Sequence, residues 1–294
     1  MSGSVAAGEP GWPAGTSVVV GVIGDPVRHS LSPVLHNAAF AALGLDWVSV
    51  AFSVPPVSLD AALAGARALG VRGLSVTMPH KEAVAAKVDR TSAAAARLGA
   101  VNCVVIEPDG LVGENTDGQG FVAALHRGAG FDPSGRRCLV AGAGGAARAV
   151  VLALAEAGAS EVVVVGRSPV RVADAASLAG RVGRAGVPSE AADAELVVNA
   201  TPLGMAGTTE AGALPPIDPV LLGPGQLVVD LVYAPRPTRW LELAQRRGAE
   251  VLDGLGMLVH QAALQVELWS GCHAPVEAMW HAVTVRPFPP SVAR

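Results

Sequence analysis

Lysine is almost absent from this chain. Of its 21 basic residues only Lys81 and Lys87 are lysines, and the other 19 are arginines. Arginine serves as well as lysine on a solvated surface, but it cannot give up its proton, whereas a lysine can donate and accept one. Lys81 closely follows a Thr-Met-Pro turn in the stretch GLSVTMPHK. Taken alone it is an ordinary surface lysine, as we take Lys87 to be, so a special role has to rest on other residues.

Cysteine and long apolar runs are scarce as well. The three cysteines, Cys103, Cys138 and Cys272, are odd in number and lack metal-like spacing, which is typical of free thiols in a reducing cytoplasm. No stretch of about 18 apolar residues occurs, so we expect no membrane span. Residues 1–16 are rich in Gly, Ser and Pro without a basic start or apolar core, which indicates a flexible tail rather than a signal peptide. The net charge of −4 and the pI near 6.0 favour neither nucleic acid nor a membrane surface as a partner.

What the chain does contain is apolar material for two domains. It has 294 residues, of which 51% are apolar, mostly Ala, Val and Leu, and only 4% aromatic. This composition is typical of helices packed over buried parallel strands. Short β-branched runs alternate with longer Ala/Leu-rich segments, which predicts βαβ units around a parallel sheet and hence an α/β fold.

The alternation predicts nine strands and nine helices. The strands are Val18–Ile23, Trp47–Phe52, Gly73–Val76, Asn102–Ile106, Arg137–Val140, Glu161–Val165, Leu196–Asn199, Leu227–Leu231 and Glu250–Leu252. The helices are Pro33–Leu43, Leu59–Leu69, Lys81–Val88, Thr91–Leu98, Gly118–Gly128, Gly145–Ala157, Val170–Gly180, Thr238–Arg247 and Met257–Ser270. We expect the last helix to return to the first domain, with Leu268 and Trp269 in its core.

The clearest motif is a dinucleotide fingerprint. A strand runs directly into Gly142-Ala143-Gly144-Gly145-Ala146-Ala147, which then opens a helix. In this G-x-G-x-x-A pattern the first glycine permits the tight turn, the second lets the backbone approach a pyrophosphate, and the alanine allows close helix–strand packing. The amides at the helix start would face the phosphates.

The end of the next strand indicates which cofactor binds. An NAD site usually has Asp or Glu there to bind the ribose 2′-hydroxyl. This chain has Gly166-Arg167-Ser168, with Arg171 one helical turn further on. Because arginines can hold a 2′-phosphate and no carboxylate repels it, we predict NADP.

Polar residues gather after the strands of the first part. GDPVRHSLSP follows the first strand and places Ser30 and Ser32 before a helix, where two hydroxyls and free amides make a natural carboxylate grip. A helix N-cap is an equally good account of Ser32. Asn102 lies in GAVNCV and Asp117 in ENTDG. For His29, His36 and His80 we expect helix-capping or surface roles, and for His260 packing.

Eight motifs together resemble the shikimate dehydrogenase family. They occur in that family's order between Gly24 and about Gly271: GDPVRHSLSP, SVTMPHK, GAVNCV, ENTDGQG, AGAGGAARA, NATPLGM, DLVYAPRPT and DGLGMLVHQAA. The resemblance implies NADP-dependent, reversible reduction of 3-dehydroshikimate to shikimate, in the pathway to chorismate and the aromatic amino acids.

The resemblance also implies roles for individual residues. Lys81 and Asp117 match the catalytic pair, and Ser30 and Ser32 match the serines that hold the substrate carboxylate. The remaining substrate-binding positions are Thr77, Asn102, Asp117, Tyr233 and Gln261. The cofactor positions are Gly142, Ala143, Gly144, Gly145, Ala146, Gly166, Arg167, Ser168, Arg171, Thr201, Leu231, Gly254 and Met257. Two positions depart from the common pattern: Ser75 stands where many members have Asn, and Gly166 where Asn often precedes Arg.

This chemistry gives a reason for a lysine at position 81. Hydride transfer to a ring ketone develops negative charge on the oxygen, and a proton must arrive there. A lysine ammonium can stabilise that charge and donate the proton, and neutral lysine can accept it in reverse, whereas arginine would hold the charge without releasing a proton.

The expected architecture has four parts: a tail (1–16), a substrate-binding domain (17–117), an NADP-binding Rossmann domain (118–254), and a C-terminal helical segment (255–294) packed on the first domain. We expect the active site between the two domains, in a monomer or a homodimer without a metal. Two alternatives stay open: a quinate or amino-shikimate dehydrogenase of the same family, and a non-catalytic NADP-binding regulatory protein, which would be expected to lose the Lys/Asp pair.

Overall fold

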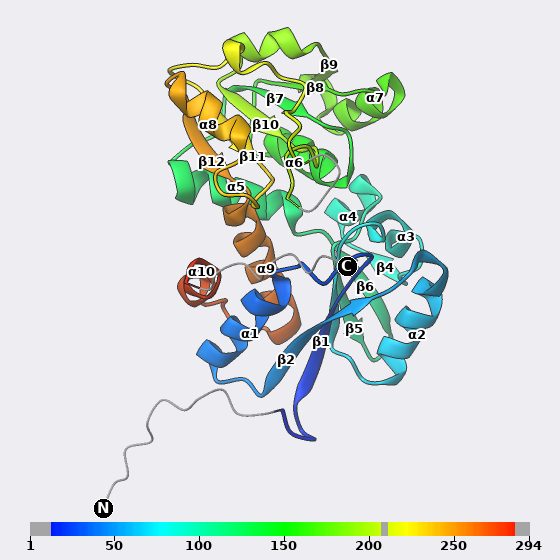
Figure 1. The fold of residues 1–294 in the computed structure, drawn as a ribbon. Coiled ribbons are helices and arrows are strands. Elements are labelled where there is room, and N and C mark those ends of the chain that lie inside the picture. Colours follow the sequence, from blue (N-terminus) through cyan, green and yellow to red (C-terminus); the bar gives the residue numbers. More distant parts are fainter. Residues whose placement is uncertain (1–12, 207–210, 286–294) are drawn as a thin grey trace, which may run out of the picture.

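The computed structural model describes residues 13–206 and 211–285, so most of the predicted tail lies outside the described residues. These residues form two six-stranded sheets, one above the other in Figure 1, with helices around each. The first sheet is drawn in blue to blue-green, and the second in green to orange. This arrangement confirms the two-domain α/β fold. None of the described helices is long and apolar enough to cross a membrane.

The first sheet is mixed, and the prediction of a purely parallel sheet is wrong there. Its strands are β1 (Val18–Gly24), β2 (Trp47–Ser53), β3 (Gly73–Val76), β4 (Arg90–Thr91), β5 (Cys103–Glu107) and β6 (Gly110–Glu114), in the order β2-β1-β3-β5-β6-β4. β1 is parallel to β2 and β3, but β5 is antiparallel to β3 and to β6. The reason is local: only Pro108 and Asp109 separate β5 from β6, and so short a link can join only antiparallel strands.

Helices cover both faces of this sheet. They are α1 (Ser32–Leu43), α2 (Leu59–Ala68), α3 (Lys81–Ala85) and α4 (Ala93–Leu98), with a 3-10 turn, η1 (Pro56–Ser58). One face packs against α1 through Leu35 and Phe40, and the other packs against α2 through Leu59 and Leu63.

The second sheet is fully parallel. Its strands are β7 (Arg137–Ala141), β8 (Glu161–Val165), β9 (Gly183–Ala185), β10 (Leu196–Asn199), β11 (Leu227–Asp230) and β12 (Glu250–Asp253). The order β12-β11-β10-β7-β8-β9 is that of a Rossmann domain. The helices around it are α6 (Gly145–Glu156), α7 (Pro169–Ser177) and α8 (Arg239–Arg246), with the 3-10 turns η2 (Gly180–Val182), η3 (Pro188–Asp193) and η4 (Pro219–Leu221).

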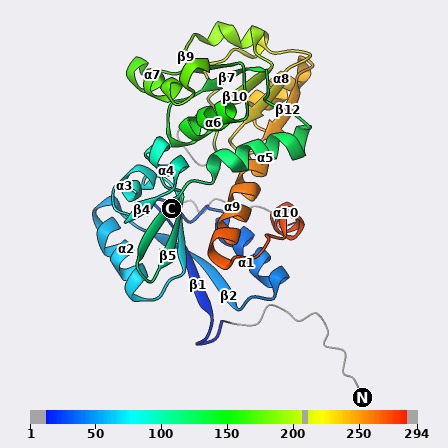
Figure 2. The same ribbon diagram turned by 180° about the vertical axis from the view of Figure 1, so that it is seen from behind.

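Two helices connect the domains. α5 (Asp117–Ala129) leads from the first sheet to the second, and α9 (Leu255–Ser270) returns; α10 (Val276–Thr284) follows it (Figure 2). A Cβ on Gly120 of α5 would lie 2.7 Å from the backbone nitrogen of Gln261, so the two helices pack closely. Trp269, at the end of α9, donates a hydrogen bond from Nε1 to the Val104 carbonyl at 3.1 Å. The predicted return of the last long helix to the first domain is therefore confirmed.

All nine predicted strands and all nine predicted helices are present. The strands Gly73–Val76, Glu161–Val165 and Leu196–Asn199 have the predicted bounds, and the other elements have shifted ends. The sequence interpretation missed β4, β6, β9 and α10. It was also wrong about two side chains: Leu268 is 41% exposed rather than in the core, and His36 is buried inside α1 rather than capping a helix or lying at the surface. His80 does occupy the N-cap position of α3, but it is buried and its side chain makes no capping hydrogen bond. Trp269 is buried as predicted, and Lys87 is exposed and pairs with Asp60.

Substitution by alanine should have opposite effects on stability at two glycines of the first domain, because their surroundings differ. A Cβ on Gly73 would lie 2.2 Å from Nε1 of the buried Trp269, whereas a Cβ on Gly65, inside α2, would meet no atom within 4 Å. We therefore expect Gly73→Ala to lower the free energy of unfolding by about 1–3 kcal/mol through overpacking. Gly65→Ala should raise it by up to about 1 kcal/mol through helix propensity. Urea unfolding measures both, and equal effects of the two substitutions would contradict this packing.

Candidate active site

Four chain segments meet at one edge of the first sheet. β1 and β3 are parallel, so both end at that edge, with Ile23 opposite Val76. β5 runs the other way and therefore begins there, while β6 ends there, with Cys103 opposite Glu114. The segments that carry the predicted serines, Lys81, Asn102 and Asp117 consequently all lie at this edge. The antiparallel pair that the sequence interpretation missed brings the last two together.

Lys81 is held at the first turn of α3. The Thr77 amide donates to the Ile23 carbonyl at 2.9 Å, and the His80 amide donates to the Thr77 carbonyl at 3.0 Å. The buried His80 ring binds the Val54 carbonyl through Nε2 at 2.7 Å. These contacts direct the Lys81 ammonium to the Asp117 carboxylate, with Nζ 2.6 Å from Oδ2. The Lys81 side chain is 20% exposed and that of Asp117 is 6% exposed.

The Asp117 carboxylate has a partner on each oxygen. Lys81 occupies Oδ2, and the Asn102 amide donates from Nδ2 to Oδ1 at 2.7 Å. Asn102 is in turn oriented by the Thr116 amide, which donates to its Oδ1 at 2.8 Å. Asp117 also donates its own amide to Asn115 Oδ1 at 3.1 Å. The carboxylate is therefore fixed, and Lys81 makes no other side-chain hydrogen bond within the described residues.

The second domain and α9 contribute two of the predicted substrate residues. Gln261 of α9 accepts from Asn102 Nδ2 at 3.4 Å. Tyr233 follows β11 and packs against the apolar cluster that contains Leu31 and Leu35 of the first domain. Burial raises the pKa of the Tyr233 hydroxyl, so it stays protonated and remains a donor.

The two serines lie at the start of α1. Leu31 occupies the N-cap position, so the N-cap interpretation of Ser32 is wrong; Ser32 is the first residue of the helix. The Ser32 amide donates to Ser30 Oγ at 3.2 Å. Among the described residues, no hydrogen bond joins these serines or the Thr77 side chain to the Lys81–Asp117 pair.

The glycine motif forms a cradle that fits a phosphate group. Gly142 follows β7 with φ +124°, and a Cβ there would lie 2.8 Å from the Ala200 carbonyl oxygen. A Cβ on Gly144 or Gly145 would meet nothing within 4 Å, so the space in front of them is open. Gly144 is the N-cap of α6 and has no side-chain cap. The amides of the first turn, including that of Ala146, are thus available to an anion.

The end of β8 is shaped for a second anion. Gly166, Arg167 and Arg171 are exposed, and Ser168 caps α7 by accepting from the Arg171 amide. Neither guanidinium has an acidic partner within the part of the chain that the structure describes. No carboxylate occurs between Gly166 and Arg171. This arrangement fits the 2′-phosphate of NADP.

The other predicted cofactor residues line the same edge of the second sheet. Thr201 donates from Oγ1 to Asn199 Oδ1 at 2.6 Å, and the Leu231 amide donates to the Asn199 carbonyl at 2.9 Å. A Cβ on Gly254 would lie 2.0 Å from the Leu231 carbonyl oxygen, which requires glycine at the start of α9. Met257 lies in the first turn of that helix.

The sequence interpretation missed a buried carboxylate, Asp230, that organises this edge. It accepts from Asn199 Nδ2 at 2.8 Å, from the Val232 amide at 3.0 Å and from Thr238 Oγ1 at 2.7 Å. These bonds hold both ends of the loop that carries Tyr233. Burial raises the pKa of Asp230 to about 6. The sequence signal that could have identified Asp230 is its position as the first residue of the DLVY motif.

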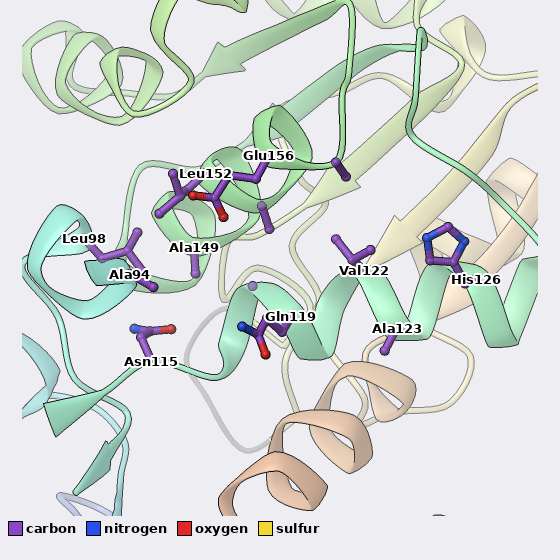
Figure 3. Close-up of a pocket in the computed structure, with 13 residues that line it drawn as sticks. Ala94, Leu98, Asn115, Gln119, Val122, Ala123, His126, Ala149, Leu152 and Glu156 are labelled. Carbon is purple, nitrogen blue, oxygen red and sulfur yellow. The ribbon is translucent and has the colours of Figure 1, made fainter. Parts of the chain in front are cut away.

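A cavity of about 400 Å³ lies between α4, α5 and α6 (Figure 3). Asn115, Gln119, His126 and Glu156 line it, together with apolar side chains, but none of the predicted site residues does. The described residues contain no group of three or more His, Cys, Asp or Glu that could hold a metal ion.

Comparison with known proteins identifies the family. Residues 22–104 match the shikimate dehydrogenase substrate binding domain, and residues 254–284 match the shikimate 5′-dehydrogenase C-terminal domain. Shikimate dehydrogenase (NADP(+)) of Moorella thermoacetica is 50% identical over 271 residues, which is 89% of this chain and 90% of that protein. The chain belongs to the shikimate dehydrogenase family.

Solved structures agree with this assignment. Shikimate 5-dehydrogenase of Thermus thermophilus, solved with NADP(H) and shikimate, matches with a TM-score of 0.84 and 40% identity over 90% of this chain and 98% of that one. Quinate dehydrogenase of Corynebacterium glutamicum, solved with NAD, matches with a TM-score of 0.83 and 32% identity over 91% and 98%. Enzymes named for different substrates and solved with different cofactors therefore share this fold, so the fold alone does not choose between them.

The raised pKa of Asp230 predicts a pH-dependent contribution to stability. Because burial raises its pKa from 3.8 to about 6, the folded chain binds this proton more tightly than the unfolded chain. The stabilisation is complete below about pH 4 and is lost as the pH rises through about 6. Asp230→Asn removes this effect. The free energy of unfolding of the variant, relative to wild type, should therefore rise across this range by up to roughly 2–3 kcal/mol.

Urea unfolding at a series of pH values measures that difference. Asp174→Asn, which changes an exposed carboxylate of the same domain, is the control and should show no such rise. A difference between Asp230→Asn and wild type that stays constant with pH would contradict the assignment.

Proposed function

We propose that this chain catalyses the NADP-dependent, reversible reduction of 3-dehydroshikimate to shikimate in the pathway to chorismate and the aromatic amino acids. The observation that carries the proposal is the 2.6 Å contact between the Lys81 ammonium and the Asp117 carboxylate, fixed by Asn102. A regulatory protein that only binds NADP has no need to retain this pair. Three free cysteines support a cytoplasmic location.

In this proposal residues 17–117 bind the substrate and residues 118–254 bind NADP. Of the predicted last segment, 255–294, the described part (255–285) packs back on the first part, and residues 286–294 lie outside the described residues. The hydroxyls of Ser30 and Ser32 hold the substrate carboxylate at the start of α1. Side chains that lie at the same edge or reach it from the second domain bind the ring oxygens; these are Thr77, Asn102, Asp117, Tyr233 and Gln261. All of them come from one chain, so the proposal applies to a monomer or a homodimer.

NADP(H), when bound, supplies or accepts the hydride. The residues that would hold its pyrophosphate are Gly142, Ala143, Gly144, Gly145 and Ala146, and those that would hold its 2′-phosphate are Gly166, Arg167, Ser168 and Arg171. Thr201, Leu231, Gly254 and Met257 would line the nicotinamide end.

Lys81 moves the proton. During reduction its ammonium faces the developing negative charge on the ketone oxygen, stabilises it, and donates a proton to it. In the oxidation of shikimate the neutral amine takes the proton from the hydroxyl. Asp117 holds Lys81 in place through Oδ2 while Asn102 prevents the carboxylate from rotating.

The two lysines of the chain form a matched test. Lys81→Ala should lower turnover of shikimate with NADP by roughly 100-fold or more, because both charge stabilisation and proton transfer are lost. Lys87→Ala removes the exposed lysine that lies just after α3 and pairs with Asp60. This variant should keep wild-type turnover. Absorbance of the reduced nicotinamide follows both reactions, with shikimate or quinate and NADP or NAD as alternative substrates.

Other outcomes would overturn parts of the proposal. Preference for quinate with NAD would assign the chain to the sister activity. Cofactor binding without turnover of any pair would favour the regulatory protein. A fully active Lys81→Ala variant would leave a dehydrogenase without the proposed role for Lys81.

Arg167 tests the choice of cofactor. Arg167→Ala should raise the KM for NADP by about 10-fold or more, since a charge-assisted contact to the 2′-phosphate is lost, and should leave the KM for NAD unchanged. Arg181→Ala is the control: this exposed arginine precedes β9, at the opposite edge of the sheet from the glycine cradle. Equal changes in KM for NADP and NAD would place the 2′-phosphate elsewhere.

A further inference from the structure

A chain of buried polar side chains lies behind the proposed substrate site. It begins at His36 of α1, which is fully buried and makes an edge contact with the Trp269 ring, with ring centroids 4.9 Å apart. His36 Nδ1 lies 3.0 Å from the Ser49 hydroxyl of β2. The chain continues at Gln265 of α9, which is 1% exposed.

Gln265 connects directly to the residues of the site. Its Nε2 donates to Gln261 Oε1 at 2.9 Å and to the Asn102 carbonyl at 3.1 Å. Asn102 hydrogen-bonds the Asp117 carboxylate, and Gln261 hydrogen-bonds Asn102. Gln265 therefore contacts the Lys81–Asp117 pair only through these two residues.

Within this set of buried polar side chains, two atoms have no hydrogen-bond partner: His36 Nε2 and Gln265 Oε1. The Gln265 side chain nevertheless acts on the imidazole. It raises the pKa of His36, against a larger lowering by burial that leaves the pKa at about 3. His36 is therefore neutral, and each of the two atoms is the available partner of the other.

The donors and acceptors permit one consistent assignment. If His36 carried its proton on Nδ1, its Nε2 lone pair would face the Gln265 carbonyl oxygen, and two acceptors repel. With the proton on Nε2, the Ser49 hydroxyl donates to Nδ1, and Nε2–H becomes the donor that the unpartnered Gln265 Oε1 lacks. Rotating the Gln265 amide by half a turn would place its oxygen against the Gln261 and Asn102 oxygens, which is equally unfavourable.

We infer that His36 and Gln265 are positioning residues that fix the side-chain amide of Gln261 for substrate binding. Gln265 Nε2 donates to Gln261 Oε1 and so fixes the orientation of the Gln261 amide. Gln261 Nε2 donates one of its hydrogens to the Leu258 carbonyl at 2.8 Å. The second hydrogen then remains for a ring hydroxyl of the substrate. This inference rests on the proposed substrate site and adds two residues that do not touch the substrate.

A double-mutant cycle tests whether Gln265 acts through Gln261. Gln265→Met keeps the length of the side chain but removes its hydrogen bonds. It should raise the KM for shikimate on the order of 3- to 10-fold, with kcat and the KM for NADP nearly unchanged. The double variant Gln261→Ala/Gln265→Met should have the KM of Gln261→Ala alone. Multiplicative effects, or a fall in kcat without a change in KM, would overturn the inference.

Variants of His36 test the inference in two ways: one should restore the KM for shikimate, and NMR of the ring reports its tautomer without any turnover. His36→Leu should reproduce the KM of Gln265→Met, whereas His36→Gln, which can place an N–H near the position of Nε2, should restore it. Nitrogen-15 NMR of the histidine rings should show His36, assigned by its absence in His36→Gln, as the neutral Nε2–H tautomer. An Nδ1–H tautomer would overturn the inference even if shikimate proved not to be the substrate. Failure of wild type to oxidise shikimate, with the Nε2–H tautomer observed, would overturn the proposed function alone.

Discussion

The Asp117 carboxylate is buried at the first residue of α5, and a buried carboxylate is stable only when its charge is compensated. Lys81 supplies the opposite charge, Asn102 donates to the second oxygen, and the start of α5 adds the positive end of a helix dipole. Each partner comes from a different segment of the first domain. Compensation of this one charge therefore depends on all of these segments meeting at the same place.

The mixed first sheet makes this possible. In a purely parallel sheet, the start of β5 would lie at the opposite edge from the end of β3, and Asn102 would be far from Lys81. Because β5 is reversed, the Val76 amide instead donates to the Asn102 carbonyl, and Asp117 follows β6 to the same place. The parallel second sheet serves a different purpose, since its strand ends present glycine-rich turns and helix starts to a dinucleotide. α5 and α9 join the two sheets, and through hydrogen bonds of Gln261 and Gln265 to Asn102 the return helix contacts the candidate site as well as the core.

Most elements and the two-domain fold could be predicted from the sequence because their signals are local. The glycine motif between β7 and α6, the missing acid after β8, and the Thr-Met-Pro turn before Lys81 each appear within a few residues. The β5–β6 hairpin was missed although Pro108-Asp109-Gly110 is a turn signal, because the surrounding alternation favoured parallel strands. The other misses depend on contacts between distant segments. Nothing local shows that His36 would be buried against Trp269, or that Asp230 would join Asn199 and Thr238.

The most direct test of the central claim separates the charge of Lys81 from its proton. Lys81→Arg keeps a cation beside Asp117 but cannot release a proton under working conditions. Single-turnover reduction of 3-dehydroshikimate by bound NADPH, followed by stopped-flow absorbance, reports the chemical step. The account predicts that this variant binds both ligands and reduces the ketone roughly 100-fold more slowly than wild type. A wild-type rate in Lys81→Arg would show that Lys81 contributes charge alone and that the proton comes from elsewhere.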